Sequence, residues 1–188
     1  MAIPATQIKI GMILLHQGKP HRVVSKQHVT PGKGNAVVQT NLQSLESGST
    51  FNQRFRSAES VEPARLETHE LQYLYQSGDE YTFMNQETYE MVNLTKEVLG
   101  DNAAYLQENL VISAEYWQGN IVGIEVPMNL VFTITETDPA MKGATASGGP
   151  KPALLDNGLT IKVPQHLSVG DKVKIDTRDD TFIERVTD

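Results

Sequence analysis

The chain has 188 residues, of which 39% are hydrophobic and 21% charged, and its formal net charge is −7. It contains no cysteine, which excludes disulfides, thiolate zinc sites and cysteine nucleophiles. No apolar run approaches the ~18 residues of a membrane span and the first residues lack a signal-peptide pattern. We therefore expect a cytoplasmic globular protein, with one or two ordinary domains or three small ones.

Charge is distributed unevenly along the chain. Residues 1–65 hold 8 basic and 3 acidic side chains (net +5), and residues 66–127 hold 1 and 11 (net −10). Residues 128–188 hold 7 and 9 (net −2). An anionic partner would thus be met by the first third of the chain and repelled by the middle third.

Short strands joined by turns are predicted for residues 7–64. Strands are expected at 11–16, 21–27, 36–42 and 50–56, with turns at 17–20 and 46–48. Alternation in the last strand places Phe51 and Phe55 on one face and Arg54 and Arg56 on the other. The pattern predicts an SH3-like (KOW-like) barrel, domain 1–64, which ends in a polar connector at 57–64. Its core is small, so we expect it to dock on its neighbour.

One stretch of this module, His28-Val-Thr-Pro-Gly-Lys-Gly-Asn-Ala36, places Lys33 between two glycines. The Pro-Gly and Gly-Asn pairs are strong turn signals, because proline presets one dihedral angle and glycine accepts positive φ. The stretch therefore predicts a hairpin tip that carries a cation into solvent. Taken alone, such a lysine is more often solubilising than functional.

The middle of the chain predicts a second barrel, domain 65–127. It reads as a hairpin at 71–84, short helical segments at 95–100 and 102–107, and a second hairpin at 110–126. Strands that enclose one short helix are typical of an oligonucleotide-binding (OB) barrel.

Residues 128–188 predict a third barrel. Strands are expected at 130–135, 159–163, 172–176 and 181–186. The first two are separated by a loop at 138–152 that is rich in glycine, proline and small residues, and a loop of this length is usually functional or mobile. A short internal similarity between Ile124-Glu-Val-Pro127 and Ile161-Lys-Val-Pro164 is consistent with two OB barrels of one type.

No enzymatic constellation is evident, and we expect neither catalytic residues nor a metal site. Phosphate-binding, dinucleotide-binding and serine-hydrolase glycine motifs are absent, and the five histidines are scattered over all three modules. Aromatic residues of the middle module could stack on bases, but a core role is favoured: Tyr73, Tyr75, Tyr81, Phe83 and Trp117. Phe182 and Arg185 could form a small RNA-binding patch, or serve as a core residue and a surface charge.

Three stretches together resemble bacterial elongation factor P over the full length of the chain. They are Lys26–Ala36 with its central Lys33, Leu71-Gln-Tyr-Leu-Tyr-Gln-Ser-Gly-Asp79 with Phe83-Met84, and Thr137–Gly149 followed by Lys151-Pro-Ala, Gly158-Leu and Lys162-Val-Pro164. The resemblance implies an all-β protein of three barrels in an L-shaped arrangement that mimics a tRNA. It also implies ribosome binding beside peptidyl-tRNA and relief of stalling at consecutive prolines.

The resemblance further implies roles for individual residues. Lys33 would face the peptidyl transferase centre and could carry an enzymatic extension, supported by Pro31, Gly32, Gly34 and Asn35. The RNA contacts expected elsewhere are Arg54, Arg56, Gly143, Ala144, Thr145, Phe182 and Arg185. Ala144 and Phe182 depart from the residues frequent in relatives, aspartate and tyrosine.

The partners expected are the ribosome (rRNA and ribosomal proteins), peptidyl-tRNA and a lysine-modifying enzyme. We expect a monomer without a cofactor or a membrane partner. A general RNA-binding or RNA-chaperone protein built from OB barrels is the alternative to a ribosome-specific factor, and an enzyme is a distant third.

Overall fold

The computed structural model describes residues 1–140 and 149–187, which form three antiparallel sheets. Contacts divide the chain into two compact units, Met1–Thr68 with Ala114–Gly123 and His69–Ser113 with Ile124–Asp188. Among the described residues, no helix is both long enough and apolar enough to cross a membrane. The protein is all-β, as predicted.

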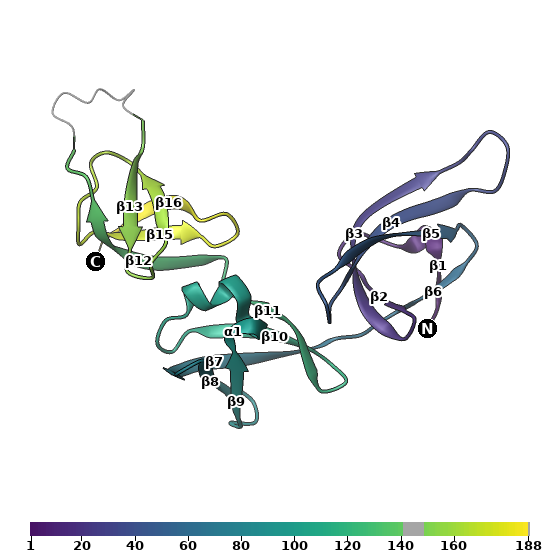
Figure 1. The fold of residues 1–188 in the computed structure, drawn as a ribbon, viewed down its shortest axis with the longest axis horizontal. Coiled ribbons are helices and arrows are strands. Elements are labelled where there is room, and N and C mark those ends of the chain that lie inside the picture. The colour runs from purple at the N-terminus through teal and green to yellow at the C-terminus, as the bar shows by residue number, and fades with distance from the viewer. Residues whose placement is uncertain (141–148, 188) are drawn as a thin grey trace. The chain divides into compact units, whose positions relative to one another are not determined.

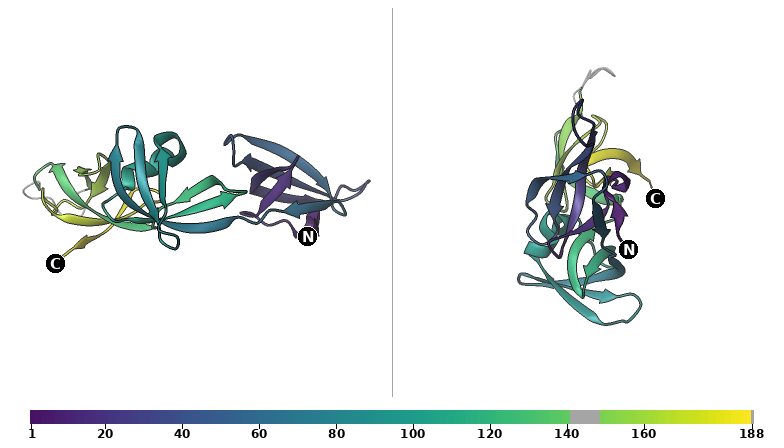
Figure 2. Two further views of the ribbon diagram at one scale, coloured as in Figure 1. Left: turned by 90° about the horizontal axis from the view of Figure 1, so that it is seen from below. Right: turned by 90° about the vertical axis from the view of Figure 1, so that its right-hand side faces the viewer.

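The first sheet has six strands in the order β1-β6-β2-β3-β4-β5 and is strongly twisted (Figures 1 and 2). Its elements are β1 (Ile3–Pro4), η1 (Ala5–Gln7), β2 (Ile13–His16), β3 (Lys19–Val29), β4 (Val37–Ser44), β5 (Thr50–Arg56) and β6 (Ser60–Pro63). Its core is aliphatic apart from Phe55: Ala5, Ile8, Leu14, Val23, Val38, Leu42, Phe55 and Val61. Phe51 packs against this core and Arg54 and Arg56 are exposed, so the predicted faces of β5 are confirmed.

Two predictions for this module are wrong. The connector 57–64 contains strand β6, which pairs with both β1 and β2 and buries Val61. A single valine between polar neighbours is too little periodicity to reveal a strand. The predicted turn 17–20 closes after Gly18, because the buried Pro20 already pairs with Leu15 inside the β2–β3 ladder.

The second sheet has the order β11-β10-β7-β8-β9. Its elements are β7 (Glu67–Ser77), β8 (Glu80–Asn85), β9 (Met91–Thr95), α1 (Lys96–Leu99), η2 (Gly100–Tyr105), β10 (Val111–Trp117) and β11 (Asn120–Glu125). Both predicted hairpins are present. The second predicted helical segment is a 3₁₀ helix, and strand β9 was not predicted. The Thr95 side chain caps α1 by accepting from the Val98 amide at 3.4 Å.

The third sheet has the order β14-β13-β12-β15-β16. Its strands are β12 (Asn129–Thr137), β13 (Lys151–Leu155), β14 (Thr160–Val163), β15 (Lys172–Asp176) and β16 (Thr181–Val186). The prediction that 138–152 is entirely loop is wrong, because β13 begins at Lys151. Lys151 is buried and its Nζ donates to the Asp138 carbonyl, so a charged residue occupies an inward position and conceals the alternation with Ala153 and Leu155.

The family-like arrangement of the modules and the predicted boundaries at 64 and 127 stay predictions. The contact-based division differs from them, since it places 114–123, the tip of the β10–β11 hairpin, in the first unit.

Candidate functional site

The Lys33 loop lies at the tip of the long β3–β4 hairpin, here called the arm, at one end of the first sheet (Figure 1). Strands β3 and β4 pair from His21↔Ser44 to Val29↔Val37, and residues 30–36 connect them. Strand β5 continues beside β4 as far as Arg56↔Val37. The loop therefore projects from a three-stranded base, which fixes where the arm ends while leaving its tip uncovered by neighbouring strands.

The two glycines beside Lys33 differ in their backbone requirements. Gly34 has φ of +131°, a conformation that residues with a side chain rarely adopt, and a Cβ there would lie 3.7 Å from Pro31 Cγ. Gly32 has no such φ, and a Cβ there would have no neighbour within 4 Å. The loop thus requires glycine for its conformation only at position 34.

The Lys33 side chain is exposed, and no partner holds its ammonium within residues 1–140 and 149–187. An ammonium on a flexible four-carbon stem can contact a phosphate as a point charge, and it is chemically open to acylation. Lys26 on β3 is different, because its Nζ donates to the carbonyls of Ile8 at 2.6 Å and Thr6 at 3.1 Å. Of these two lysines, Lys33 is the one available to a partner.

Arg54 and Arg56 extend the positive charge along β5, beside the loop end of the arm. They are two residues apart on β5, both exposed, and register with Gln39 and Val37 of β4. Their guanidinium groups have no acidic partner among the described residues. The structure therefore places the Lys33 loop, Arg54 and Arg56 at the same end of the first sheet.

A shallow hollow of about 330 Å³ lies next to these arginines on the outer face of the sheet. Amide and hydroxyl side chains predominate among its lining residues, Ser25, Lys26, Gln27, Gln39, Thr40, Asn41 and Asn52. The Asn52 amide donates to Asn41 Oδ1 at 3.2 Å. Amide groups both donate and accept, so the hollow offers hydrogen bonds to a polar partner, and Lys26 is the charged residue among its lining.

The remaining predicted contacts lie in the second unit. Gly143, Ala144 and Thr145 fall outside the described residues. Phe182 is half-buried against the core of the third sheet, and Arg185 Nη2 donates to Asp171 Oδ1 at 3.1 Å. Phe182 and Arg185, the two residues of the predicted patch, therefore both make contacts within their own barrel.

The aromatic residues of the central sheet are mostly structural, as favoured from the sequence. Phe83 is fully buried and Tyr81 is 8% exposed, whereas Tyr75 is 57% exposed. The Tyr73 ring lies 5.5 Å from that of Phe83, centroid to centroid. The aromatic residues of the central sheet therefore do not form a continuous surface on which bases could stack.

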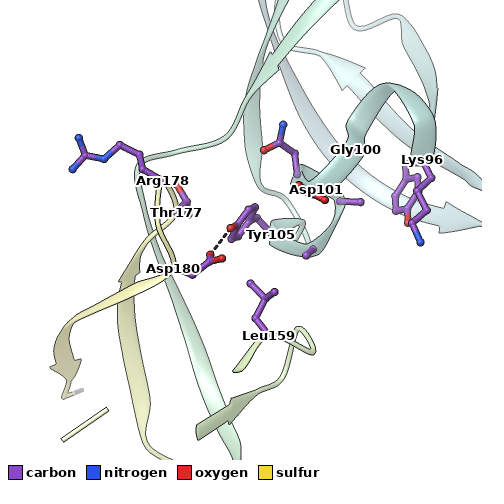
Figure 3. Close-up of a pocket in the computed structure, with 12 residues that line it drawn as sticks. Lys96, Gly100, Asp101, Tyr105, Leu159, Thr177, Arg178 and Asp180 are labelled. Atoms are coloured by element: carbon purple, nitrogen blue, oxygen red, sulfur yellow. Dashed lines mark hydrogen bonds between the residues drawn. The ribbon is translucent and has the colours of Figure 1, made fainter. Parts of the chain in front are cut away.

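A pocket of about 590 Å³ lies within the second unit and is shown in Figure 3. Its lining includes Lys96, Asp101, Tyr105, Arg178 and Asp180. The Tyr105 hydroxyl donates to Asp180 Oδ1 (dashed in Figure 3), and burial, reinforced by this bond, raises the Tyr105 pKa.

Other polar groups in and beside this pocket are also paired. Hydrogen bonds from Arg178 lower the pKa of Asp176 to about 2. Asn157 Nδ2 donates to the Ala104 carbonyl at 3.0 Å, and Gln107 Nε2 donates to the Val131 carbonyl at 2.7 Å. No set of three potential metal ligands occurs among the described residues. The pocket is best explained as a junction between η2 and the third sheet.

Family models match three consecutive segments of the chain. Residues 4–61 match the elongation factor P KOW-like domain, 66–124 its OB domain, and 130–185 its C-terminal domain. The chain is 45% identical over 188 residues to elongation factor P of Gemmatimonas aurantiaca, covering 100% of both chains. It is 42% identical over 185 residues to that of Acidobacterium capsulatum, covering 98% of this chain and 100% of the relative.

A solved structure of eukaryotic translation initiation factor 5A from Methanococcus jannaschii has the same fold over part of the chain. The TM-score is 0.54 at 19% identity, covering 68% of this chain and 92% of that one. The three family-model matches and the full-length relatives identify the class as a translation elongation factor. The chain belongs to the elongation factor P family.

Proposed function

We propose that this protein binds the ribosome beside peptidyl-tRNA and stimulates peptide bond formation at consecutive prolines through the Lys33 loop. The observation that carries the proposal is the exposed Lys33 ammonium at the end of the arm, which has no partner in the part of the chain that the structure describes. A thin cationic loop suits a site walled by RNA, because it adds charge complementarity while excluding little volume.

The loop would act by orientation rather than by chemistry. Proline is a slow acceptor because its geometry is poor, and holding the peptidyl-tRNA end in a reactive position lowers the entropic part of the barrier. Arg54 and Arg56 would hold phosphates next to the arm, and the loop containing Gly143, Ala144 and Thr145 would contact RNA elsewhere. A cytoplasmic monomer without a cofactor, acting without being an enzyme itself, is part of the same proposal.

The Lys33 ammonium is also the group at which a modifying enzyme would act. An extension there would lengthen the reach of the loop without changing its backbone. The mass of the intact protein from its native cell distinguishes an extended lysine from a bare one.

Lys33→Ala is the test of the main proposal. In a reconstituted translation system, synthesis of a polyproline reporter should fall to the level without the factor, while synthesis of a proline-free reporter should not change. Lys9→Ala, an exposed lysine elsewhere in the basic module, serves as the charge-matched control. Full polyproline synthesis with Lys33→Ala would refute the proposed role of the loop.

Binding to free RNA separates this proposal from a general RNA chaperone. A ribosome-specific factor should bind unstructured oligonucleotides weakly, whereas a chaperone should bind them well with a steep salt dependence. The strongly acidic segment 66–127, net −10, supports the ribosome-specific reading.

A further inference from the structure

An ion pair joins two segments of the first unit that lie 93 positions apart in the sequence. Arg22 Nη2 donates to Glu115 Oε2 at 3.0 Å, and the two side chains are 37% and 26% exposed. Arg22 lies on β3, the strand whose far end leads into the Lys33 loop, and Glu115 lies on β10. The pair thus fastens the tip of the β10–β11 hairpin (114–123) to the base of the arm.

Gly123, on the neighbouring strand β11, makes room for this contact. A Cβ at position 123 would lie 2.8 Å from Glu115 Oε2 and 3.7 Å from Glu115 Cβ. The φ of Gly123 is outside the positive region, so the backbone itself does not require glycine. Glycine inside a strand is unfavourable and often marks a close approach. Here the close approach is the Glu115 carboxylate, which occupies the space that a side chain would fill.

We propose that Arg22, Glu115 and Gly123 form a positioning latch for the Lys33 arm. Gly123 leaves the space, Glu115 fills it, and the carboxylate holds the arm through Arg22. Strand β3 runs from Lys19 to Val29 with a β-bulge between Val23 and Ser25, and its pairing with β4, which β5 flanks in turn, carries the position of Arg22 to the loop. The inference rests on the proposed function, since a loop that acts by orientation works only in the fraction of molecules whose arm is held in the binding position.

Gly123→Ala is the variant that opens the latch with the least damage to the fold. The added methyl group meets the flexible end of the Glu115 side chain rather than backbone, so it displaces the carboxylate from Arg22. Glu46→Gln is the matched control. It removes the 2.9 Å ion pair between Glu46 and Lys19, which lies on β3 like Arg22, and it leaves the β10–β11 hairpin unchanged. Thermal unfolding should be the same for both variants and the parent.

The latch can be observed directly with spin labels, because the chain has no native cysteine. Ala58→Cys and Asn120→Cys place labels at two exposed positions of the first unit, one beside the first sheet and one on the β10–β11 hairpin. Gly123→Ala should broaden the distance distribution between the labels, and Glu46→Gln should leave it as in the parent. An unchanged distribution in Gly123→Ala would overturn the latch.

Charge reversal provides a second, independent variant set. Arg22→Glu alone should broaden the same distribution, and adding Glu115→Arg should narrow it again. If the double variant is as broad as the single one, the ion pair is not the holding contact, and the proposal fails even if Gly123→Ala behaves as expected.

The functional readout is the concentration that gives half-maximal rescue of the polyproline reporter. This concentration should rise about two- to fivefold in Gly123→Ala, with the maximal rate unchanged. A change of this size is expected when a weak, partly exposed ion pair determines the fraction of molecules whose arm is held in the binding position. If Lys33→Ala abolishes rescue while Gly123→Ala changes neither readout, only the latch is wrong. If Lys33→Ala has no effect, the proposed function fails, and the spin-label distances still decide whether the latch exists.

Discussion

The two arginines near the Lys33 end of the first sheet differ from two arginines of the third module in how they are neutralised. Arg54 and Arg56 have no acidic partner among the described residues. In contrast, Arg178 pairs with Asp176 at 2.6 Å and Arg185 pairs with Asp171 at 3.1 Å. The Lys33 end of the first sheet therefore keeps its positive charge available for an external anion, whereas Arg178 and Arg185 are neutralised within their own barrel.

This difference indicates which part of an acidic protein can meet RNA. A net charge of −7 would disfavour nucleic acid if it were spread evenly, but unpaired cations gathered at one end create a local positive potential. A cation that is already paired also contributes less to the affinity for a partner, because the existing ion pair must be broken first. We accordingly expect Arg185 to contribute less to RNA binding than Arg54.

The largest effect is expected from removing the free arginines. Arg54→Ala with Arg56→Ala should weaken ribosome binding about 30-fold at low salt and reduce the slope of log affinity against log salt by about 2, because two phosphate contacts are lost. Binding of the labelled factor to ribosomes across a salt series measures both quantities.

The matched control is Lys174→Ala with Arg178→Ala, which removes two cations that are already paired. It should leave the affinity and the salt slope close to those of the parent. If the control weakens binding as much as the arginine double variant does, net charge rather than pairing governs the interaction, and the contrast between the two sheets loses its functional meaning.

The next effect concerns the conformation of the loop rather than its charge. Gly34→Ala should raise the half-maximal concentration for polyproline rescue about tenfold, since a side chain at φ of +131° carries roughly 1–3 kcal/mol of strain. Gly32→Ala adds the same methyl group in open space and should change rescue less than twofold. Equal behaviour of the two variants would mean that the loop works without the conformation seen at Gly34.

The sequence allowed the modules, both central hairpins and the faces of β5 to be predicted, because each depends on local periodicity and turn residues. The glycine requirement could not be assigned to one position, since the sequence places Lys33 symmetrically between two glycines and φ depends on the folded loop. Strand β13 was missed because Lys151 is inward-facing, against the usual exposure of lysine.

The Arg22–Glu115 contact could not be predicted from the sequence for a different reason. Arg22 and Glu115 are 93 residues apart, so only the fold brings them together. The available signal was Gly123, an isolated glycine inside the apolar run 121–126. Such a glycine indicates that something approaches the strand closely, without indicating which side chain it is.

The smallest effect should come from the internally satisfied part of the molecule. Tyr105→Phe removes the hydroxyl that donates to Asp180 and leaves a carboxylate oxygen without that donor, so it should destabilise the second unit by about 1 kcal/mol. Chemical denaturation monitored by circular dichroism at neutral pH measures this. Tyr75→Phe, a 57% exposed tyrosine on β7, is the matched control and should leave stability unchanged.

Alkaline pH tests the cause of the effect. Burial raises the Tyr105 pKa in the folded state, whereas the unfolded chain releases this proton near pH 10. Stability conferred by the protonated hydroxyl is complete below pH 10 and is lost as pH rises above it, up to the higher folded pKa. The stability advantage of the parent over Tyr105→Phe should therefore shrink above pH 10. A constant difference across that range would show that the Tyr105 hydroxyl contributes through packing alone, and that the junction is not held by the bond to Asp180.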